Sequence, residues 1–90
     1  MPGVPRARSE IVDFFRASAL EVAKLALPDV DEQTRLADLG VDSVALVEIV
    51  TAVERRASVV IDDAALVRIR AVGDLVEEVL RAEARREALP

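Results

Sequence analysis

Apolar residues recur at helical spacing in three separate stretches of this chain, and this pattern constrains the fold more than any other feature. In the last stretch they follow the i, i+3, i+4, i+7, i+8 order of an amphipathic helix: Val72, Leu75, Val76, Val79 and Leu80. The same kind of spacing predicts a first helix over Ser9–Leu27 and a second over Ser43–Arg56. A short β-prone run, Ser58–Ile61, has no partner run. The sequence therefore predicts a helical fold.

Residues with strong capping or backbone preferences set the limits of these helices. Ser9 is the predicted N-cap of the first helix, and Pro28 ends it. Asp42 is a good N-cap for the second helix. The pair Asp62–Asp63 offers a cap for a brief helical stretch through Val67, and a turn follows before the last helix.

The two ends of the chain lack this pattern. Two prolines and a glycine make residues 1–8 a poor helix, and we expect a flexible leader there. Beyond Leu80 the apolar face is lost, so residues 83–90 are predicted to form a frayed tail. The folded domain is expected over residues 9–82.

A connection of about fifteen residues, from Pro28 to Asp42, joins the first and second helices without a sustained apolar period. Loops of this length in compact domains are usually functional or disordered. Leu36, Leu39 and Val41 supply anchors, so we expect an ordered loop draped over the helices. The predicted fold class is all-α, a small antiparallel bundle of three to four helices with a long loop between helices one and two.

The composition excludes several classes of function. The chain has 90 residues, no Cys and no His, so it can build neither a disulfide, a zinc finger nor a Ser-His or Cys-His catalytic pair. We therefore expect one domain that is not an enzyme and binds no metal. No stretch has the length of a signal peptide's apolar core or of a membrane span. This favours a cytoplasmic protein, and we expect a monomer.

The net charge of -5 is concentrated in one part of the chain. Residues 29–63 hold nine acids and three bases, a net of -6, whereas residues 1–28 have a net of +1 and residues 64–90 a net of 0. This acidity argues against nucleic-acid binding, which depends on clustered Lys and Arg. The acidic part is either a solvated face that maintains solubility or a docking face for basic partners.

The second predicted helix has two distinct faces. At about 100° per residue, one arc collects the residues assigned to the core, which are Leu46, Ile49, Val50 and Val53. The opposite side holds Val44, Glu48, Thr51 and Arg55, and Val47 lies between the two sides. Since scattered exposed apolar residues are common, the two valines outside the core arc are either ordinary surface residues or an apolar contact patch.

Ser43 lies in the first turn of this helix, after a glycine, Gly40, that permits a tight turn. Free backbone N–H groups and the positive end of the helix dipole favour an anionic group at such a position. Taken alone, a serine here is either a capping or solvent-facing residue or the carrier of a phosphodiester. The available bases are carboxylates and Lys24, so a separate enzyme would have to modify its hydroxyl.

The stretch from Leu36 to Val50, Leu-Ala-Asp-Leu-Gly-Val-Asp-Ser-Val-Ala-Leu-Val-Glu-Ile-Val, resembles the phosphopantetheine attachment motif of acyl carrier proteins. The family pattern has Leu-Gly, a variable residue, Asp-Ser, a hydrophobic residue and then Glu four residues later. These places are filled by Leu39, Gly40, Asp42, Ser43, Val44 and Glu48. Val72–Val76 resembles the opening of the family's final helix, and the similarity covers Ser9–Leu80.

The resemblance implies that Ser43 receives 4′-phosphopantetheine from coenzyme A through a phosphopantetheinyl transferase, with Asp42 as its motif neighbour and helix cap. The arm's thiol, which this Cys-free chain lacks, would hold acyl groups as thioesters. The second helix would be the main recognition element, with the docking residues Val44, Val47, Glu48 and Thr51. The implied partners are a ketosynthase, an acyltransferase or other acyl-transferring enzymes with basic docking surfaces.

The details of the motif bear on the type of carrier. Ala45–Leu46 resembles carriers of polyketide pathways, whereas Arg55 and Arg56 reduce the acidity that a fatty-acid carrier would have. Val41–Asp42 differs from the Gly-Gly or Gly-His that precedes the serine in aminoacyl and peptidyl carriers. We expect a discrete carrier of a polyketide or related secondary-metabolite pathway. The alternatives are a fatty-acid or aminoacyl/peptidyl carrier and, in another class, an unmodified acidic helical interaction domain.

Overall fold

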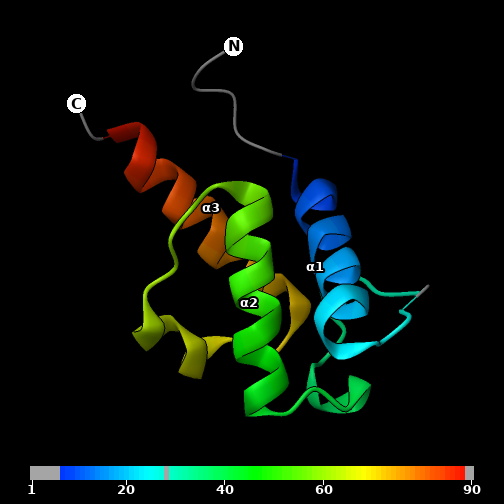
Figure 1. The fold of residues 1–90 in the computed structure, drawn as a ribbon. Helices are drawn as coiled ribbons and strands as arrows, with labels where there is room; N and C mark the ends of the chain where they lie inside the picture. The colour runs from blue at the N-terminus through cyan, green and yellow to red at the C-terminus, as the bar shows by residue number, and fades with distance from the viewer. Residues whose placement is uncertain (1–6, 28, 89–90) are drawn as a thin grey trace.

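The computed structural model describes residues 7–27 and 29–88, and these form three α-helices and two short 3₁₀ helices. In chain order they are α1 (Arg8–Ala23), η1 (Ala37–Leu39), α2 (Ser43–Ala57), η2 (Asp63–Arg68) and α3 (Val72–Ala88) (Figure 1). The described residues contain no strand, only an isolated antiparallel bridge between Arg35 and Ala71. The predicted all-α bundle with a long loop between its first two long helices is confirmed.

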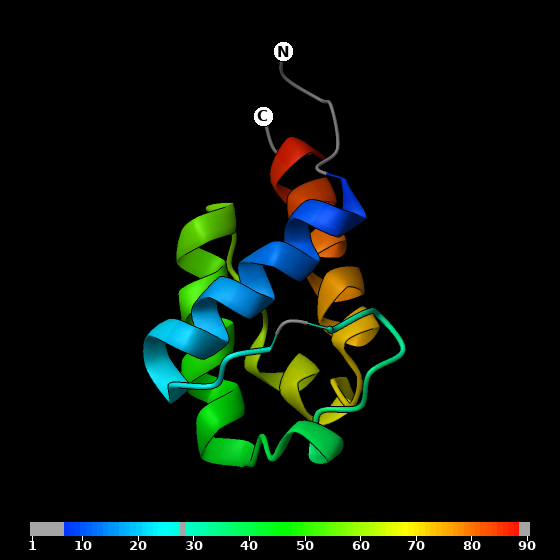
Figure 2. The ribbon, with the colours of Figure 1, turned by 90° about the vertical axis from the view of Figure 1, so that its right-hand side faces the viewer.

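The three long helices pack around one core. α1 runs opposite to α2 and α3, as Figures 1 and 2 show. Phe15 and Ile11 of α1 meet residues from the inner faces of the other two helices, and the largest of these are Ile49, Val53, Leu75, Val72, Val76 and Val79. α1 begins and α3 ends at one end of the bundle, whereas α2 begins at the opposite end (Figures 1 and 2).

The limits of α1 differ from those predicted. Ser9 is not the N-cap, because the helix starts at Arg8 with Ala7 in the capping position and no side-chain cap. The helix also ends at Ala23, four residues before the predicted end, since Lys24 adopts a left-handed conformation with φ of 59° and the Leu25 N–H donates to Ala19 O at 3.1 Å. Leu25 and Leu27 still pack against the core, but from the segment that follows the helix.

α3 continues beyond the end of its apolar stripe. The sequence predicts fraying after Leu80, whereas the helix extends to Ala88 and buries Ala82 and Glu83. Arg86 donates to the carbonyl oxygens of Ala57 and Ser58 at the end of α2, at 3.3 and 2.6 Å. The predicted domain limits at residues 9 and 82 stay a prediction. Residues 1–6 of the predicted leader at 1–8 and the last two residues of the chain lie outside the described part, and Arg8 already belongs to α1.

The long loop is ordered by backbone pairing with the start of α3. The Leu36 N–H donates to Arg70 O at 2.9 Å, and the Val72 N–H donates to Thr34 O at 3.0 Å. The Gly73 N–H donates to Glu32 O at 2.8 Å, and a Cβ at this position would lie 2.9 Å from the same oxygen. This glycine therefore permits a close approach that a larger residue would obstruct.

The predicted anchors also hold the loop. Leu36 is buried, and Leu39 and Val41 are partly buried against the core. Gly40 has a φ of 77° and follows η1, so the sharp turn before α2 uses the left-handed conformation that glycine adopts readily. The expectation of an ordered loop is confirmed, although η1 within it was not predicted.

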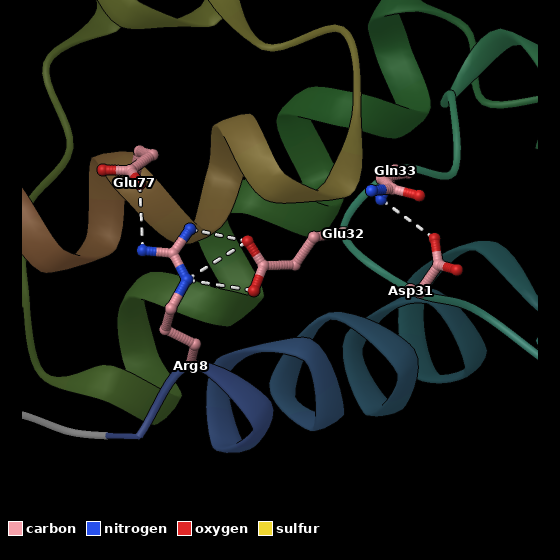
Figure 3. Close-up of polar contacts among 5 residues, drawn as sticks. All are labelled: Arg8, Asp31, Glu32, Gln33 and Glu77. Atoms are coloured by element: carbon pink, nitrogen blue, oxygen red, sulfur yellow. Dashed lines mark hydrogen bonds and ion pairs between the residues drawn. The ribbon is translucent and has the colours of Figure 1, made fainter.

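An ion-pair cluster on the surface joins α1, the loop and α3 (Figure 3). The Arg8 guanidinium contacts both carboxylate oxygens of Glu32, at 2.6 Å for the shortest contact, and lies 2.9 Å from Glu77 Oε1. The neighbouring turn is closed locally, because Asp31 Oδ1 accepts from the Gln33 N–H at 2.9 Å. Hydrogen bonding to Arg8 lowers the pKa of Glu32 from its ordinary value.

Candidate functional site

The first turn of α2 places Ser43 in an exposed position at the end of a capped helix. Asp42 is the N-cap, with extended backbone, and its Oδ1 accepts from the Ala45 N–H at 2.8 Å. The Asp42 carbonyl accepts the first helical bond, from the Leu46 N–H at 2.9 Å. The predicted cap is thus confirmed, and it fixes Ser43 as the first residue of the helix.

The backbone around Ser43 favours an anion. Within residues 7–27 and 29–88, no protein group accepts a hydrogen bond from the N–H of Ser43 or Val44. These two donors point out of the first turn of a helix of 15 residues, where the helix dipole is positive. The arrangement fits a phosphodiester on the exposed Ser43 hydroxyl, because the phosphate oxygens would lie near these two N–H donors.

A hollow of about 270 Å³ opens beside this serine. Its apolar lining comes from the loop, α2 and the segment before α3, and includes Leu36, Val41, Leu46 and Ile69. Its polar lining consists of Arg35, Asp42, Ser43 and Arg70. The hollow is smaller than pockets that enclose a whole drug-sized ligand, so it can take up only part of a flexible group attached to Ser43.

The outer face of α2 carries the residues predicted for docking. Val44 and Val47 are 67% and 48% exposed, which is high for apolar side chains, and Glu48 and Thr51 are exposed beside them. The Thr51 hydroxyl donates to Val47 O at 2.9 Å, so this hydroxyl already has a partner within the helix. The structure thus brings the four side chains together on one exposed face, and their role in docking stays a prediction.

The inner face of α2 matches the predicted core with two additions. Ile49, Val50 and Val53 are buried and Leu46 is partly buried. Ala52 and Ala57 are also fully buried. A small side chain gives little periodic signal, which is why the two alanines did not enter the predicted core.

The acidic side chain next to Ser43 has a structural role. In the described part of the chain no three His, Cys, Asp or Glu residues gather as metal ligands. No helix there is both long and apolar enough to cross a membrane. The nearest acid, Asp42, uses one carboxylate oxygen as the helix cap.

Sequence analysis missed two residues of this site, Arg35 and Arg70. Both line the hollow beside Ser43, but they come from different segments that the Arg35–Ala71 bridge brings together. Nothing in the sequence predicts that contact, because neither segment has a strand pattern. The one available signal is that Arg35 is a base within a strongly acidic segment, and this alone does not point to Arg70.

Comparison with known proteins agrees with the resemblance noted in the motif. Residues 13–79 match the family described as "Phosphopantetheine attachment site". The fold is similar to the crystal structure of an acyl carrier protein from Thermotoga maritima, with 28% sequence identity, a TM-score of 0.81, and coverage of 88% of this chain and 93% of that one. No curated protein sequence matches the chain.

Proposed function

Because this chain belongs to the phosphopantetheine-attachment family and is an acyl carrier protein by family and fold, we propose that Ser43 is its attachment residue. Proteins of this family are carriers and not catalysts, and they hold 4′-phosphopantetheine covalently. The observation that carries the proposal is the exposed Ser43 hydroxyl at the first position of α2, between the Asp42 cap and two unpaired backbone donors, inside the matched region.

Attachment is a phosphoryl-type transfer to the serine hydroxyl. The Ser43 oxygen forms a new bond to the phosphorus of coenzyme A that bears the pantetheine, and the bond from that phosphorus to the adenosine bisphosphate breaks. The hydroxyl proton leaves to a base on the transferase. On this side of the reaction the chain supplies the nucleophile's position and the two first-turn N–H groups.

Once attached, the group supplies a thiol that holds acyl groups as thioesters. The chain's own contribution is to present that thiol to acyl-handling enzymes. Its partners are therefore these enzymes and the phosphopantetheinyl transferase that modifies the chain. We further propose that these enzymes belong to a polyketide or related secondary-metabolite pathway, a ketosynthase or acyltransferase among them. Ala45–Leu46 after the motif supports a polyketide carrier, and the basic Arg55 and Arg56 near the end of α2 argue against a fatty-acid carrier. Val41–Asp42 before the serine argues against an aminoacyl or peptidyl carrier.

The attachment is tested by intact-mass measurement. The protein is incubated with coenzyme A and a broad-specificity phosphopantetheinyl transferase, and we expect a gain of one phosphopantetheinyl group. Ser43→Ala should show no gain. Ser9→Ala is the matched control, because Ser9 is also an exposed serine in the first turn of a helix and should leave the gain unchanged.

Two outcomes would refute the proposal. One is the absence of any gain in the wild-type protein, which would favour an unmodified acidic interaction domain instead. The other is an equal gain in Ser43→Ala, which would place the attachment at another residue.

A further inference from the structure

Two arginines lie side by side at the hollow next to Ser43. Arg35 stands opposite Ala71 in the antiparallel bridge, and the neighbouring Leu36 N–H donates to Arg70 O at 2.9 Å. The backbone therefore holds the two arginines in adjacent segments. Both are exposed and both line the hollow.

Neither guanidinium is neutralised within the part of the chain that the structure describes. The arginines that form ion pairs there are Arg8, Arg16, Arg56, Arg68, Arg81 and Arg86. Within the described residues no carboxylate oxygen lies within 4.0 Å of either guanidinium, although the Arg70 backbone N–H donates to Asp74 Oδ2 at 2.9 Å and both arginines lie in or beside the most acidic part of the chain. Two like charges held together repel each other, so an anion between them would be stabilised.

Ser43 determines which anion can reach them. It lines the same hollow as both arginines, and a phosphodiester on its oxygen would bring a permanent negative charge to that place. Because the anion would be covalently tethered, its local concentration would be high and little association entropy would be lost. The N–H groups of Ser43 and Val44 would face it from the start of α2.

We propose that Arg35 and Arg70 form a site for the phosphodiester on Ser43 and hold the base of the arm against the hollow. This inference rests on the proposed attachment at Ser43. The two arginines act as positioning residues, because they touch neither the thiol nor the acyl group. The apolar lining beneath them, Leu46 and Ile69 among it, then lies next to the first part of the arm.

The test compares modified and unmodified protein in three backgrounds: wild type, Arg35→Gln/Arg70→Gln, and Arg55→Gln/Arg85→Gln. The last is the matched control, because Arg55 and Arg85 are also exposed and without an ion pair in the described residues, but do not line the hollow. In the wild type at low salt we expect modification to raise Tm by about 4 °C. The rise should fall by half or more in the first variant and persist in the control.

Salt and phosphorus NMR provide measurements that do not depend on the variants. In the modified wild type, the Tm rise should shrink at high salt, because the site is exposed. The ³¹P resonance should have the linewidth of a phosphorus that tumbles rigidly with the protein. It should sharpen in modified Arg35→Gln/Arg70→Gln, and an equally broad line in that variant would overturn the site.

The arginines could instead bind a carboxylate at the far end of the acyl group. Loading the arm with different acyl groups distinguishes this carboxylate from the phosphodiester. The phosphodiester site predicts that the arginine-dependent Tm rise is already present with a free thiol and is the same for an acetyl and a malonyl thioester. A rise that appears only with malonyl would overturn the proposal. No mass gain at all would refute the attachment itself, whereas a normal gain with equal Tm rises in all three backgrounds would refute only the arginine site.

Discussion

Arg8 shows how one exposed side chain can join segments that are distant in the sequence. Its guanidinium contacts Glu32 in the loop and Glu77 in α3, while its backbone begins α1. Glu32 makes the shorter contact, and its pKa lies below the ordinary value because it accepts hydrogen bonds from Arg8. A similar arrangement lowers the pKa of Glu21, which pairs with Arg56 between α1 and α2.

Arg8→Gln should return the pKa of Glu32 toward its ordinary value. A carboxyl whose folded pKa is depressed stabilises the protein above its unfolded pKa, and this contribution is lost as pH falls through the folded pKa. The Tm difference between wild type and variant should therefore be largest above about pH 5 and vanish in stronger acid. NMR titration of the Glu32 carboxyl measures the shift. Arg55→Gln is the control, and an unchanged Glu32 titration in Arg8→Gln would contradict the assignment.

Single residues with local chemistry were the most predictable part of the site. Asp42 caps α2 through the N–H three residues ahead, and Gly40 adopts the left-handed turn, so both roles depend only on near neighbours. Arg35 and Arg70 could not be predicted, because their significance depends on the contact between the loop and the start of α3. The close approach of Gly73 to Glu32 could not be predicted for the same reason, since the two residues are far apart in the sequence.

At the scale of the helix, α2 combines a core face with an exposed face that is apolar at its start and mixed in charge along its length. Val44 and Val47 are largely exposed beside Glu48, so this face offers a partner an apolar contact flanked by a carboxylate. Such a surface suits a partner with a basic rim, since charges around an interface mainly set orientation and association rate.

Glu48→Lys should therefore weaken transfer of an acyl group to or from a cognate ketosynthase or acyltransferase, by about tenfold at low salt, because it reverses a charge at the proposed contact. Helical content should stay unchanged, as the side chain is exposed. Circular dichroism and the salt dependence of the transfer rate measure the two effects. Asp63→Lys, at the start of η2, serves as the exposed control. Loss of folding in Glu48→Lys would instead assign this residue a structural role.

The end of α3 supports the end of α2. Arg86 brings a positive charge and hydrogen bonds to the carbonyl oxygens of Ala57 and Ser58, where the helix dipole of α2 is negative. Ser58 also adopts a left-handed conformation, with φ of 56°, and so terminates the helix. The last turns of α3 are thus part of the fold, although alanines are their only apolar residues.

Arg86→Gln should lower the free energy of unfolding by about 1 kcal/mol, the usual value for a charge-assisted bond at a helix end. Urea denaturation followed by circular dichroism measures it. Arg85→Gln, one residue earlier, changes the same charge on an exposed side chain that forms no ion pair in the described segments, and should leave stability almost unchanged. Equal effects of the two substitutions would point to net charge instead of the contact.

Helices could be predicted from the sequence where their limits depend on local residues. α2 was predicted to within one residue at both ends, because Asp42 caps its start and its apolar arc is continuous. The predicted end of α1 was wrong. Lys24 ends the helix in the left-handed conformation that usually requires a glycine, so the sequence contains no signal for this end. The full length of α3 could not be predicted either, because Arg86 donates hydrogen bonds to Ala57 and Ser58 at the end of α2, a contact that the sequence does not show.

On the scale of the whole molecule, the excess of negative charge and the proposed attachment residue lie in the same part of the chain. The net charge of -6 in residues 29–63 covers the loop, α2 and the connection after it, while the remaining chain is nearly neutral. Composition located this excess in a segment that includes Arg35, but only the fold brings Arg70 to the same hollow. The helical class and the single core followed from apolar spacing, whereas the packing of the loop on α3 depended on contacts that spacing does not encode.

The opposed positions of the helix ends also determine how the molecule can be handled. α1 begins and α3 ends at one pole, and Ser43 begins α2 at the other (Figures 1 and 2). A bead, a sensor chip or a neighbouring fusion partner joined near either of those two helix ends would therefore leave the serine facing open solution. Molecules arrayed in this way would all present the Ser43 end of the bundle to an enzyme in the surrounding solution.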